Sequence, residues 1–213
     1  MDCEQGTRLL DVATGPGYVV LAALERGAMC AGLDFSASML ELAQANVDIM
    51  SNQRAANGED EILAVMLLPG DAEALPFDQD TVDAAGGLFD AVVCNFGVLH
   101  LGEPTQFFAE AHRLLRPGGK LAFTVWCPPP ATEGFAITLG AIAQCGDPNV
   151  NLPPGPPFFH YSDEANAAEH LAAAGFDVSA RLAYWRNDRP ITYRISVCCW
   201  RRLLTFGWMG AGR

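Results

Sequence analysis

The chain carries two closely spaced glycines, Gly15 and Gly17, shortly after an apolar run that ends in an acid, Asp11. Because glycine has no Cβ, the backbone can turn sharply there and approach a ligand closely. A helix-like stretch follows at 18–26, and the amides at its start would point toward that ligand. This segment therefore predicts a strand, a tight turn and a helix that together form a site for a nucleotide-type cofactor.

Further polar residues end or closely follow other apolar runs. A carboxylate 19 residues beyond Gly15, at the end of the second run, can accept two hydrogen bonds from a ribose diol. That separation alone would also fit a dinucleotide. Several such residues around one crevice indicate a binding site rather than isolated turns. They are Asp34 after 28–33, Asp71 after 62–68, and Asn95 within 89–96.

Apolar strands alternate with helices over the first 126 residues. This order is typical of an α/β fold whose mostly parallel sheet has helices on both faces. Ligands bind such sheets at the carboxyl ends of the strands, where the strand order reverses. We expect strands at 7–13, 28–33, 62–68, 89–96 and 120–126; helices at 18–26, from the Ser38/Glu41 capping box to about 50 or beyond, and at 104–115; and loops at 53–61, 78–87 and 117–119.

The pattern weakens beyond residue 126. The length of the chain favours one domain over 1–213, with a core at 7–126, a substrate-side part at 127–197 and an atypical tail at 198–213. In the second half we expect a helix at 134–145, a candidate lid loop at 146–157, a helix from Ser162 to Gly175, and strands at 176–182 and 191–197.

The charge is acidic and uneven. The net charge is −12, and residues 1–110 hold 18 acids against three bases, whereas residues 181–213 hold one acid and seven bases. A phosphate backbone is bound mainly by Lys and Arg, so we expect a small-molecule partner and no nucleic acid.

The composition also indicates where the protein is located and whether its cysteines are reduced. The chain has no run of 18 uncharged apolar residues and no basic start followed by an apolar stretch. We therefore expect no membrane span, no secretory signal and a cytoplasmic location. The seven cysteines form no CxxC pair, so we expect reduced packing residues rather than disulfides or a metal site.

Taken together, these motifs resemble the class I S-adenosylmethionine-dependent methyltransferases, in the small-molecule group called type 11. The resemblance covers about residues 7–182 and rests on segments 9–17, 32–36, 70–77, 89–97 and 114–119, in the family's order. It implies a Rossmann-like methyltransferase fold that transfers a methyl group from S-adenosyl-L-methionine to a small-molecule acceptor. Carbon, nitrogen and oxygen acceptors all remain open.

The resemblance also implies roles for individual residues, including Ala13, which stands where the family pattern has its first glycine. His100 is the histidine nearest the expected methyl-transfer end, and it is either a general base or a hydrogen-bonded structural residue. Asp11, Ala13, Gly15 and Gly17 would form the methionine-binding loop, Asp34 and Phe35 the ribose site, Asp71 and Ala72 the adenine site, and Asn95 and Gly97 the floor beneath the sulfonium.

Two alternative functions remain: a cofactor-binding but inactive relative, and a dinucleotide-dependent oxidoreductase. The turn is followed by Tyr18-Val19-Val20, without the last small residue of the dinucleotide fingerprint, which disfavours the oxidoreductase. The first strand begins where family members have preceding helices, and the tail is apolar and basic. We therefore expect an open crevice, weak cofactor binding and self-association through 195–213.

Overall fold

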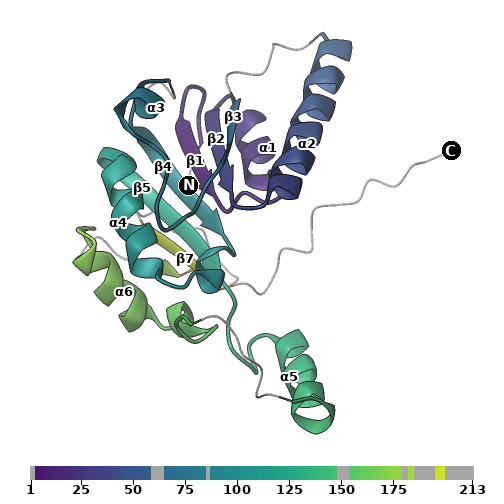
Figure 1. Ribbon diagram of the computed structural model, residues 1–213, viewed down its shortest axis with the longest axis vertical. Helices are drawn as coiled ribbons and strands as arrows, with labels where there is room; N and C mark the ends of the chain where they lie inside the picture. The colour runs from purple at the N-terminus through teal and green to yellow at the C-terminus, as the bar shows by residue number, and fades with distance from the viewer. Residues whose placement is uncertain are drawn as a thin grey trace, which may run out of the picture.

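The computed structural model describes residues 3–58, 65–84, 87–147, 154–178, 182–184 and 195–199. Its strands form one sheet in the order β3-β2-β1-β4-β5-β7-β6, and every pair of neighbours is parallel (Figure 1). The strand order reverses between β1 and β4, which creates the switch point. The strands are β1 (Arg8–Val12), β2 (Met29–Asp34), β3 (Val65–Pro69), β4 (Phe89–Asn95), β5 (Leu115–Val125), β6 (Leu182–Tyr184) and β7 (Ile195–Cys199).

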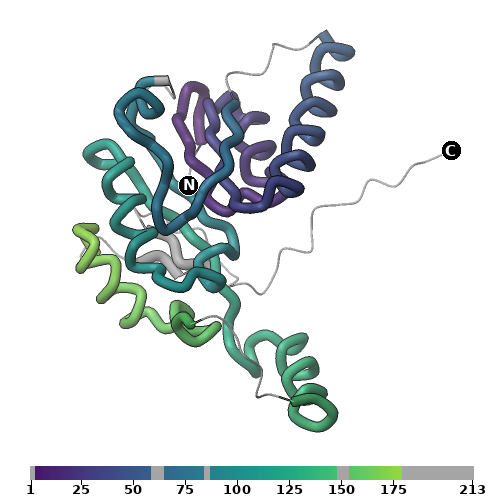
Figure 2. The backbone as a smooth tube through the Cα atoms, in the orientation of Figure 1, coloured from purple at the N-terminus to yellow at the C-terminus, as the bar shows by residue number. Residues whose placement is uncertain are grey.

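Helices connect the strands, and the tube drawing traces these crossovers (Figure 2). The predicted alternation of strands and helices is therefore confirmed. The helices are α1 (Tyr18–Leu24), α2 (Ala37–Ala56), α3 (Gln79–Ala84), α4 (Pro104–Leu114), α5 (Glu133–Cys145) and α6 (Glu164–Ala173), with short 3₁₀ turns η1 (Val98–His100) and η2 (His160–Ser162).

Apolar side chains bury both faces of the sheet. Successive residues of a strand point to opposite faces. On β1, Leu9 packs in a cluster with Val20 of α1, whereas Leu10 packs in a second cluster with Phe108 of α4 and Leu171 of α6. Because both faces are covered, β1 must be apolar at consecutive positions, as the sequence predicted.

Helix α2 differs from the prediction at its start, and it takes in part of a predicted loop at its end. Its N-cap is Ser36, which has an extended backbone, so the predicted capping box beginning at Ser38 is wrong. The helix continues to Ala56 through part of the predicted 53–61 loop. Polar residues at 51–54 lie on an outer helix rather than in a loop, and polarity alone does not distinguish the two.

The 78–87 segment, predicted as an exposed loop, contains α3. Asp78 explains this helix, because its Oδ1 accepts hydrogen bonds from the amide of Thr81 at 2.9 Å and from the Thr81 hydroxyl at 2.6 Å. A carboxylate in that position satisfies an amide that the first helical turn would leave unpaired. The predicted turn at 117–119 falls within the bounds of β5, but the pairing with β4 passes from Leu115 directly to Lys120 and Gly118 has a φ of 80°, so the strand is interrupted at the predicted place.

The second half agrees with the prediction in its helices. Helix α5 matches the predicted 134–145 helix, and α6 begins after Asp163, whose side chain accepts from the Ala165 amide at 2.8 Å. Residues 176–178 are not a strand, so that part of the predicted 176–182 strand is wrong. The predictions for 62–64, 148–153, 191–194 and most of the tail, 200–213, lie outside the described residues.

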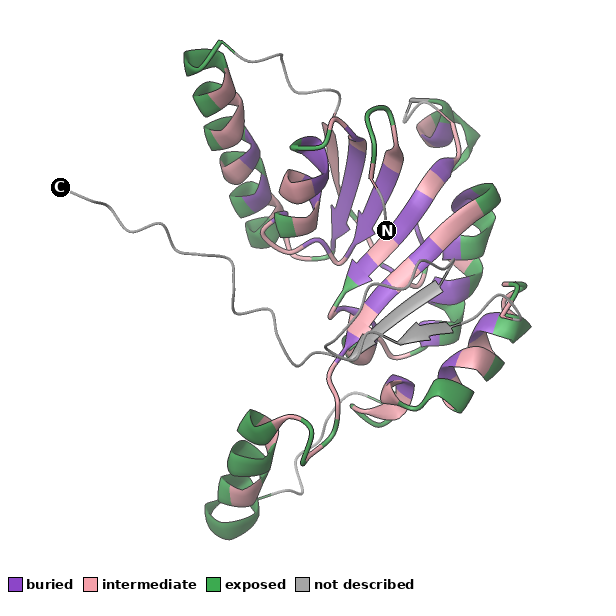
Figure 3. Ribbon diagram, turned by 180° about the vertical axis from the view of Figure 1, so that it is seen from behind, coloured by how far each residue is buried: buried purple, intermediate pink, exposed green. Residues whose placement is uncertain are grey.

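Helix α5 stands apart from the sheet and has no buried residue (Figure 3). Within the described part of the chain, no helix combines the length and apolar character needed to cross a membrane. Cys3, Cys30, Cys94 and Cys145 are free thiols, but Cys127 is disulfide-bonded, so the expectation of reduced cysteines is wrong at that position.

Candidate functional site

The turn after β1 has the backbone conformation that its glycines predicted. Gly15 and Gly17 have φ values of 52° and 81°, in the left-handed region that glycine adopts readily. A Cβ built on Gly15 would meet no atom within 4 Å, whereas one on Gly17 would lie 3.2 Å from the Ala43 Cβ. Gly17 therefore permits close packing against α2, and Gly15 faces open space that a ligand can occupy.

Asp34 links this turn to the end of β2. Its Oδ2 accepts a hydrogen bond from the Gly15 amide at 2.7 Å, and its Oδ1 accepts one from the Ser36 amide at 2.9 Å. Only 6% of Asp34 is exposed. A carboxylate offers about four acceptor positions, so Asp34 can hold the two loops together and still accept hydrogen bonds from a diol.

Asp11 lies beneath the same turn and is 1% exposed. The Thr14 hydroxyl donates to its Oδ2 at 2.6 Å, while its buried Oδ1 has no hydrogen-bond partner within the described residues. Burial raises the pKa of Asp11 to about 7, the negative charge of Asp34 acts in the same direction, and the Thr14 hydrogen bond opposes both. Asp11 therefore orients the turn through Thr14 and keeps one oxygen free.

Ala13 shows how the chain accommodates its departure from the family's first glycine. Its φ is 57°, so an alanine holds the left-handed conformation that costs non-glycine residues about 1–2 kcal/mol. A Cβ on Gly97 would lie 2.7 Å from the Ala13 Cβ and 2.6 Å from the Cys94 Sγ. The Ala13 methyl thus occupies space that only a glycine at 97 leaves open, which brings the turns after β1 and β4 into contact.

The predicted adenine and ribose residues lie along the β2 and β3 ends. Asp34 pairs in register with Pro69, so Asp71 follows the neighbouring strand end closely. Asp71 is exposed and its Oδ1 accepts from the Glu73 amide at 2.9 Å, while Ala72 is buried. Phe35 is 86% exposed, so its ring is accessible to an aromatic ligand that could stack on it.

At the end of β4, a hydroxyl group from β5 organises the backbone. Thr124 Oγ1 accepts from the Phe96 amide and donates to Asn95 Oδ1, both at 2.8 Å. Phe96 has a φ of 57° and its ring stacks on Trp126, with centroids 4.5 Å apart. His100 is exposed in η1, and its ring meets Phe158 edge-on at 6.1 Å between centroids.

The structure thus brings the ends of β1, β2 and β4 to one edge of the sheet. Three residues of this edge were missed from the sequence: Thr14, Thr124 and Trp126. Thr14 lies within segment 9–17 and Trp126 ends the predicted strand at 120–126, so their positions could have suggested them. Thr124 lies across the sheet from Asn95 in register, a relation that only strand pairing reveals.

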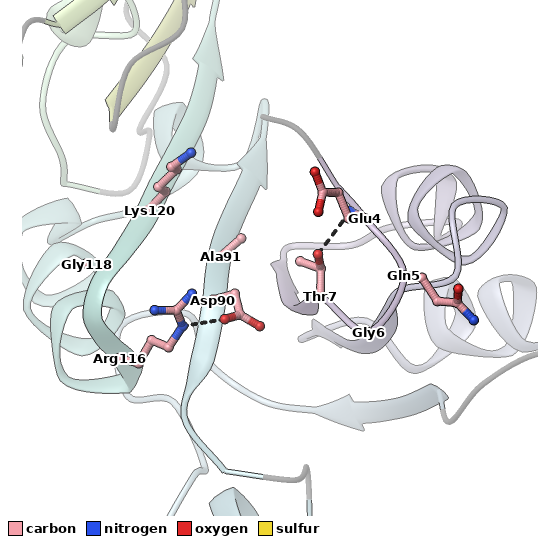
Figure 4. A pocket seen from close by; sticks show the side chains of 9 residues that line it. All are labelled: Glu4, Gln5, Gly6, Thr7, Asp90, Ala91, Arg116, Gly118 and Lys120. Carbon is pink, nitrogen blue, oxygen red and sulfur yellow. Dashed lines mark hydrogen bonds and ion pairs between the residues drawn. The ribbon is translucent and has the colours of Figure 1, made fainter.

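A polar pocket lies at the opposite edge, near the amino ends of β1, β4 and β5 (Figure 4). Asp90 accepts from the Arg8 amide at 2.7 Å and pairs with the Arg116 guanidinium. Partial burial would raise the Asp90 pKa, but these two contacts outweigh it and hold the pKa below its usual value. The pocket contains charges that neutralise one another and none of the predicted site residues.

With this geometry in place, comparison with known proteins identifies the family. A family model described as "Methyltransferase domain" matches residues 10–123. The demethylmenaquinone methyltransferase of Deinococcus radiodurans is 38% identical over 214 residues, covering 97% of this chain and 76% of that protein. The corresponding enzyme of Clavibacter sepedonicus is 33% identical over 141 residues, covering 65% of this chain and 50% of that protein.

A solved structure supports the fold. Phosphoethanolamine N-methyltransferase 2 of Haemonchus contortus, in complex with S-adenosyl-L-methionine, aligns with a TM-score of 0.52 and 22% identity, covering 82% of this chain and 34% of that one. The chain belongs to the methyltransferase domain family of S-adenosylmethionine-dependent enzymes, and its Rossmann-like α/β fold is that family's fold. It spans about half the length of some of the curated relatives that it matches.

The site residues suit the family's cofactor, S-adenosyl-L-methionine. The open space at Gly15 suits the methionine part of the cofactor, the spare acceptor positions of Asp34 suit its ribose, and the exposed ring of Phe35 can cover the adjoining part of the nucleoside. The buried, unpartnered Asp11 Oδ1 gives this edge a negative electrostatic character whenever Asp11 is ionised. A cationic cofactor without phosphate suits such an edge better than a pyrophosphate does.

Proposed function

We propose that this chain transfers a methyl group from S-adenosyl-L-methionine to a ring carbon of a quinone-type small molecule. The observation that carries the proposal is the convergence of Gly15, Asp34 and Asn95 at one edge of the sheet. The acceptor class is supported by the curated relatives, which are named demethylmenaquinone methyltransferases and, in Ruegeria, a ubiquinone/menaquinone biosynthesis C-methyltransferase.

The chain's own contribution to such a reaction is positioning. The cofactor supplies, when bound, a methyl group on a positively charged sulfur. Asp34 and Phe35 would hold its nucleoside, and the turn at 13–17 would hold its methionine part. In-line transfer forms a bond from the methyl carbon to the acceptor carbon as the sulfur–methyl bond breaks, so correct alignment lowers the barrier. The acceptor carbon then loses its proton.

Ligand-dependent thermal stability tests the cofactor part of the proposal. S-Adenosylhomocysteine should raise the melting temperature of the chain, because a ligand that binds only the folded state stabilises it by mass action. NAD and NADP should leave the melting temperature unchanged. A shift with NAD and none with S-adenosylhomocysteine would replace the methyltransferase proposal with an oxidoreductase.

The acceptor part of the proposal is tested by identifying the methylated product. The chain should be incubated with S-adenosyl-L-methionine and a reduced demethylnaphthoquinone, and the product should gain the mass of one CH₂ on a ring carbon, as located by fragmentation. Formation of S-adenosylhomocysteine without a methylated ring, or methylation on oxygen only, would count against a carbon acceptor of this class.

We further propose that His100 takes the proton lost by the acceptor carbon. Its exposed ring lies at the carboxyl edge of the sheet beside Phe158. His100→Ala should lower turnover by about 100-fold and leave S-adenosylhomocysteine affinity unchanged, because a general base acts only in the chemical step. A lower melting temperature with full activity per folded molecule would make His100 a structural residue instead.

Several expectations from the sequence stay predictions. They are the single domain over 1–213, the cytoplasmic location, the absence of a nucleic-acid partner and self-association through the tail. Residues 200–213 of that tail lie outside the described structure.

A further inference from the structure

Six aromatic side chains meet at the edge of the sheet where the acceptor must approach. Phe96 stacks on Trp126, Trp126 meets Phe135 of α5 at 5.5 Å between centroids, and Phe135 in turn meets two neighbouring phenylalanines. The members come from the segments after β4 and β5, from η1, from α5 and from the segment before η2. The aromatic cluster consists of Phe96, His100, Trp126, Phe135, Phe158 and Phe159.

The aromatic cluster adjoins the cofactor turn through one residue. Phe96 is followed by Gly97, whose backbone packs so closely on Ala13 that a Cβ at 97 would lie 2.7 Å from the Ala13 methyl. The rings therefore begin where the methyl group would be presented. Phe96 also keeps a left-handed backbone, a strained state that is found mostly where the surrounding structure imposes it at functional sites.

The hydrogen bonds of Thr124 fix the orientation of the Asn95 amide. A threonine hydroxyl has one proton to donate. Thr124 Oγ1 accepts a hydrogen bond from the Phe96 amide, and its hydroxyl donates a hydrogen bond to Asn95 Oδ1. The Asn95 carbonyl oxygen is thus turned toward Thr124. The side chain is exposed and directly precedes Phe96 of the aromatic cluster, so its NH₂ is accessible to a ligand as a donor.

We propose that Asn95 and the aromatic cluster form the acceptor subsite, which takes a flat aromatic ring bearing an oxygen atom, with Thr124 as the positioning residue. The rings provide apolar contact for the acceptor's faces and edges. The Asn95 NH₂ donates to the ring oxygen and sets which carbon faces the methyl group. This inference rests on the function proposed above and assigns Asn95 to the acceptor rather than to the cofactor.

A pair of ligands that differ by one oxygen tests the subsite. Binding of 1-naphthol and of naphthalene to the full chain, saturated with S-adenosylhomocysteine, should be measured by equilibrium dialysis. The wild-type chain should bind 1-naphthol about five- to tenfold more tightly, which is the size of one neutral hydrogen bond. Equal binding of the two ligands, or binding of neither, would overturn the inference.

Variants separate positioning from folding. Thr124→Val removes the hydroxyl at nearly constant shape and should abolish the preference for 1-naphthol while leaving naphthalene binding intact. Thr124→Ser keeps the hydroxyl and should retain the preference. Asn95→Leu, at an exposed position, should abolish it without affecting folding, because leucine can neither donate nor accept a hydrogen bond. If Thr124 has a purely structural role, Thr124→Val should weaken the binding of both ligands equally, which would contradict the assignment.

The two proposals fail in different ways. If S-adenosylhomocysteine binds normally but Thr124→Val and Asn95→Leu keep the wild-type preference, the acceptor subsite is wrong and the methyltransferase function stands. If S-adenosylhomocysteine does not bind at all, the proposed function fails, whatever the aromatic ligands do.

Discussion

Asp34→Ala is expected to weaken S-adenosylhomocysteine binding by about 10- to 100-fold, which corresponds to the 1.5–3 kcal/mol of hydrogen bonds to a charged group. Asp34 is the carboxylate placed between the glycine turn and the β2 end, with both oxygens directed by backbone amides. Alanine would remove the proposed acceptor for the ribose hydroxyls. It would also release the Gly15 and Ser36 amides, so the folded chain should lose stability even without ligand.

Because the variant changes both binding and folding, affinity should be measured directly by isothermal titration calorimetry at a temperature where the variant is folded. Asp48→Ala is the matched control, since it removes one acid from an exposed position of α2. The control should bind S-adenosylhomocysteine as the wild-type chain does. An Asp34→Ala affinity within twofold of wild type would show that Asp34 only organises the loops.

The core of the fold was predictable because its strands are buried on both faces. Leu9 and Leu10 pack against helices on opposite sides, which requires continuous apolar runs that are easily recognised. Polar surface segments carry no comparable constraint. The ends of α2 and the existence of α3 were therefore missed, although the Asp78/Thr81 pair that caps α3 is visible in the sequence.

The approach of the glycine turn to the β2 end was likewise predictable, because Gly15 and Asp34 lie at fixed spacing along a single strand–turn–helix–strand unit. The contacts of the proposed acceptor subsite were not. Thr124 meets Asn95 only through the pairing of β4 with β5, and Phe96 reaches Phe135 only through Trp126 and the placement of α5. Contacts between elements far apart in sequence depend on tertiary structure, which local residue patterns do not record.

Asp11→Asn is expected to change how the stability of the fold depends on pH. In the folded chain the pKa of Asp11 is raised from 3.8 to about 7, mainly by burial. Between these values the folded state holds a proton that the unfolded state has released. The contribution of Asp11 to the free energy of unfolding is therefore fully present below about pH 4, and it is lost progressively as the pH rises to about 7.

The size of this loss of folding stability follows from the size of the shift in the Asp11 pKa. One pKa unit is worth about 1.4 kcal/mol, so the full effect is on the order of 4 kcal/mol by pH 8. Asparagine is neutral throughout and can still accept from the Thr14 hydroxyl, but its NH₂ would be buried without a partner, at a cost of about 1–3 kcal/mol. At pH 5 the loss in the wild type and the cost of the unpaired NH₂ are similar in size, so Asp11→Asn should have about the stability of the wild type there, and it should be more stable at pH 8.

Urea unfolding at pH 5, 6, 7 and 8 measures this difference. Other carboxylates bias the comparison little, because Asp78, Asp90 and Glu110 have pKa values held below their usual range and stay ionised above pH 5. Asp48→Asn, at an exposed site on α2, should follow the wild-type pH profile. If Asp11→Asn also keeps that profile, Asp11 is ionised in the folded chain at all these pH values, and its buried Oδ1 must have a partner that stabilises the charge.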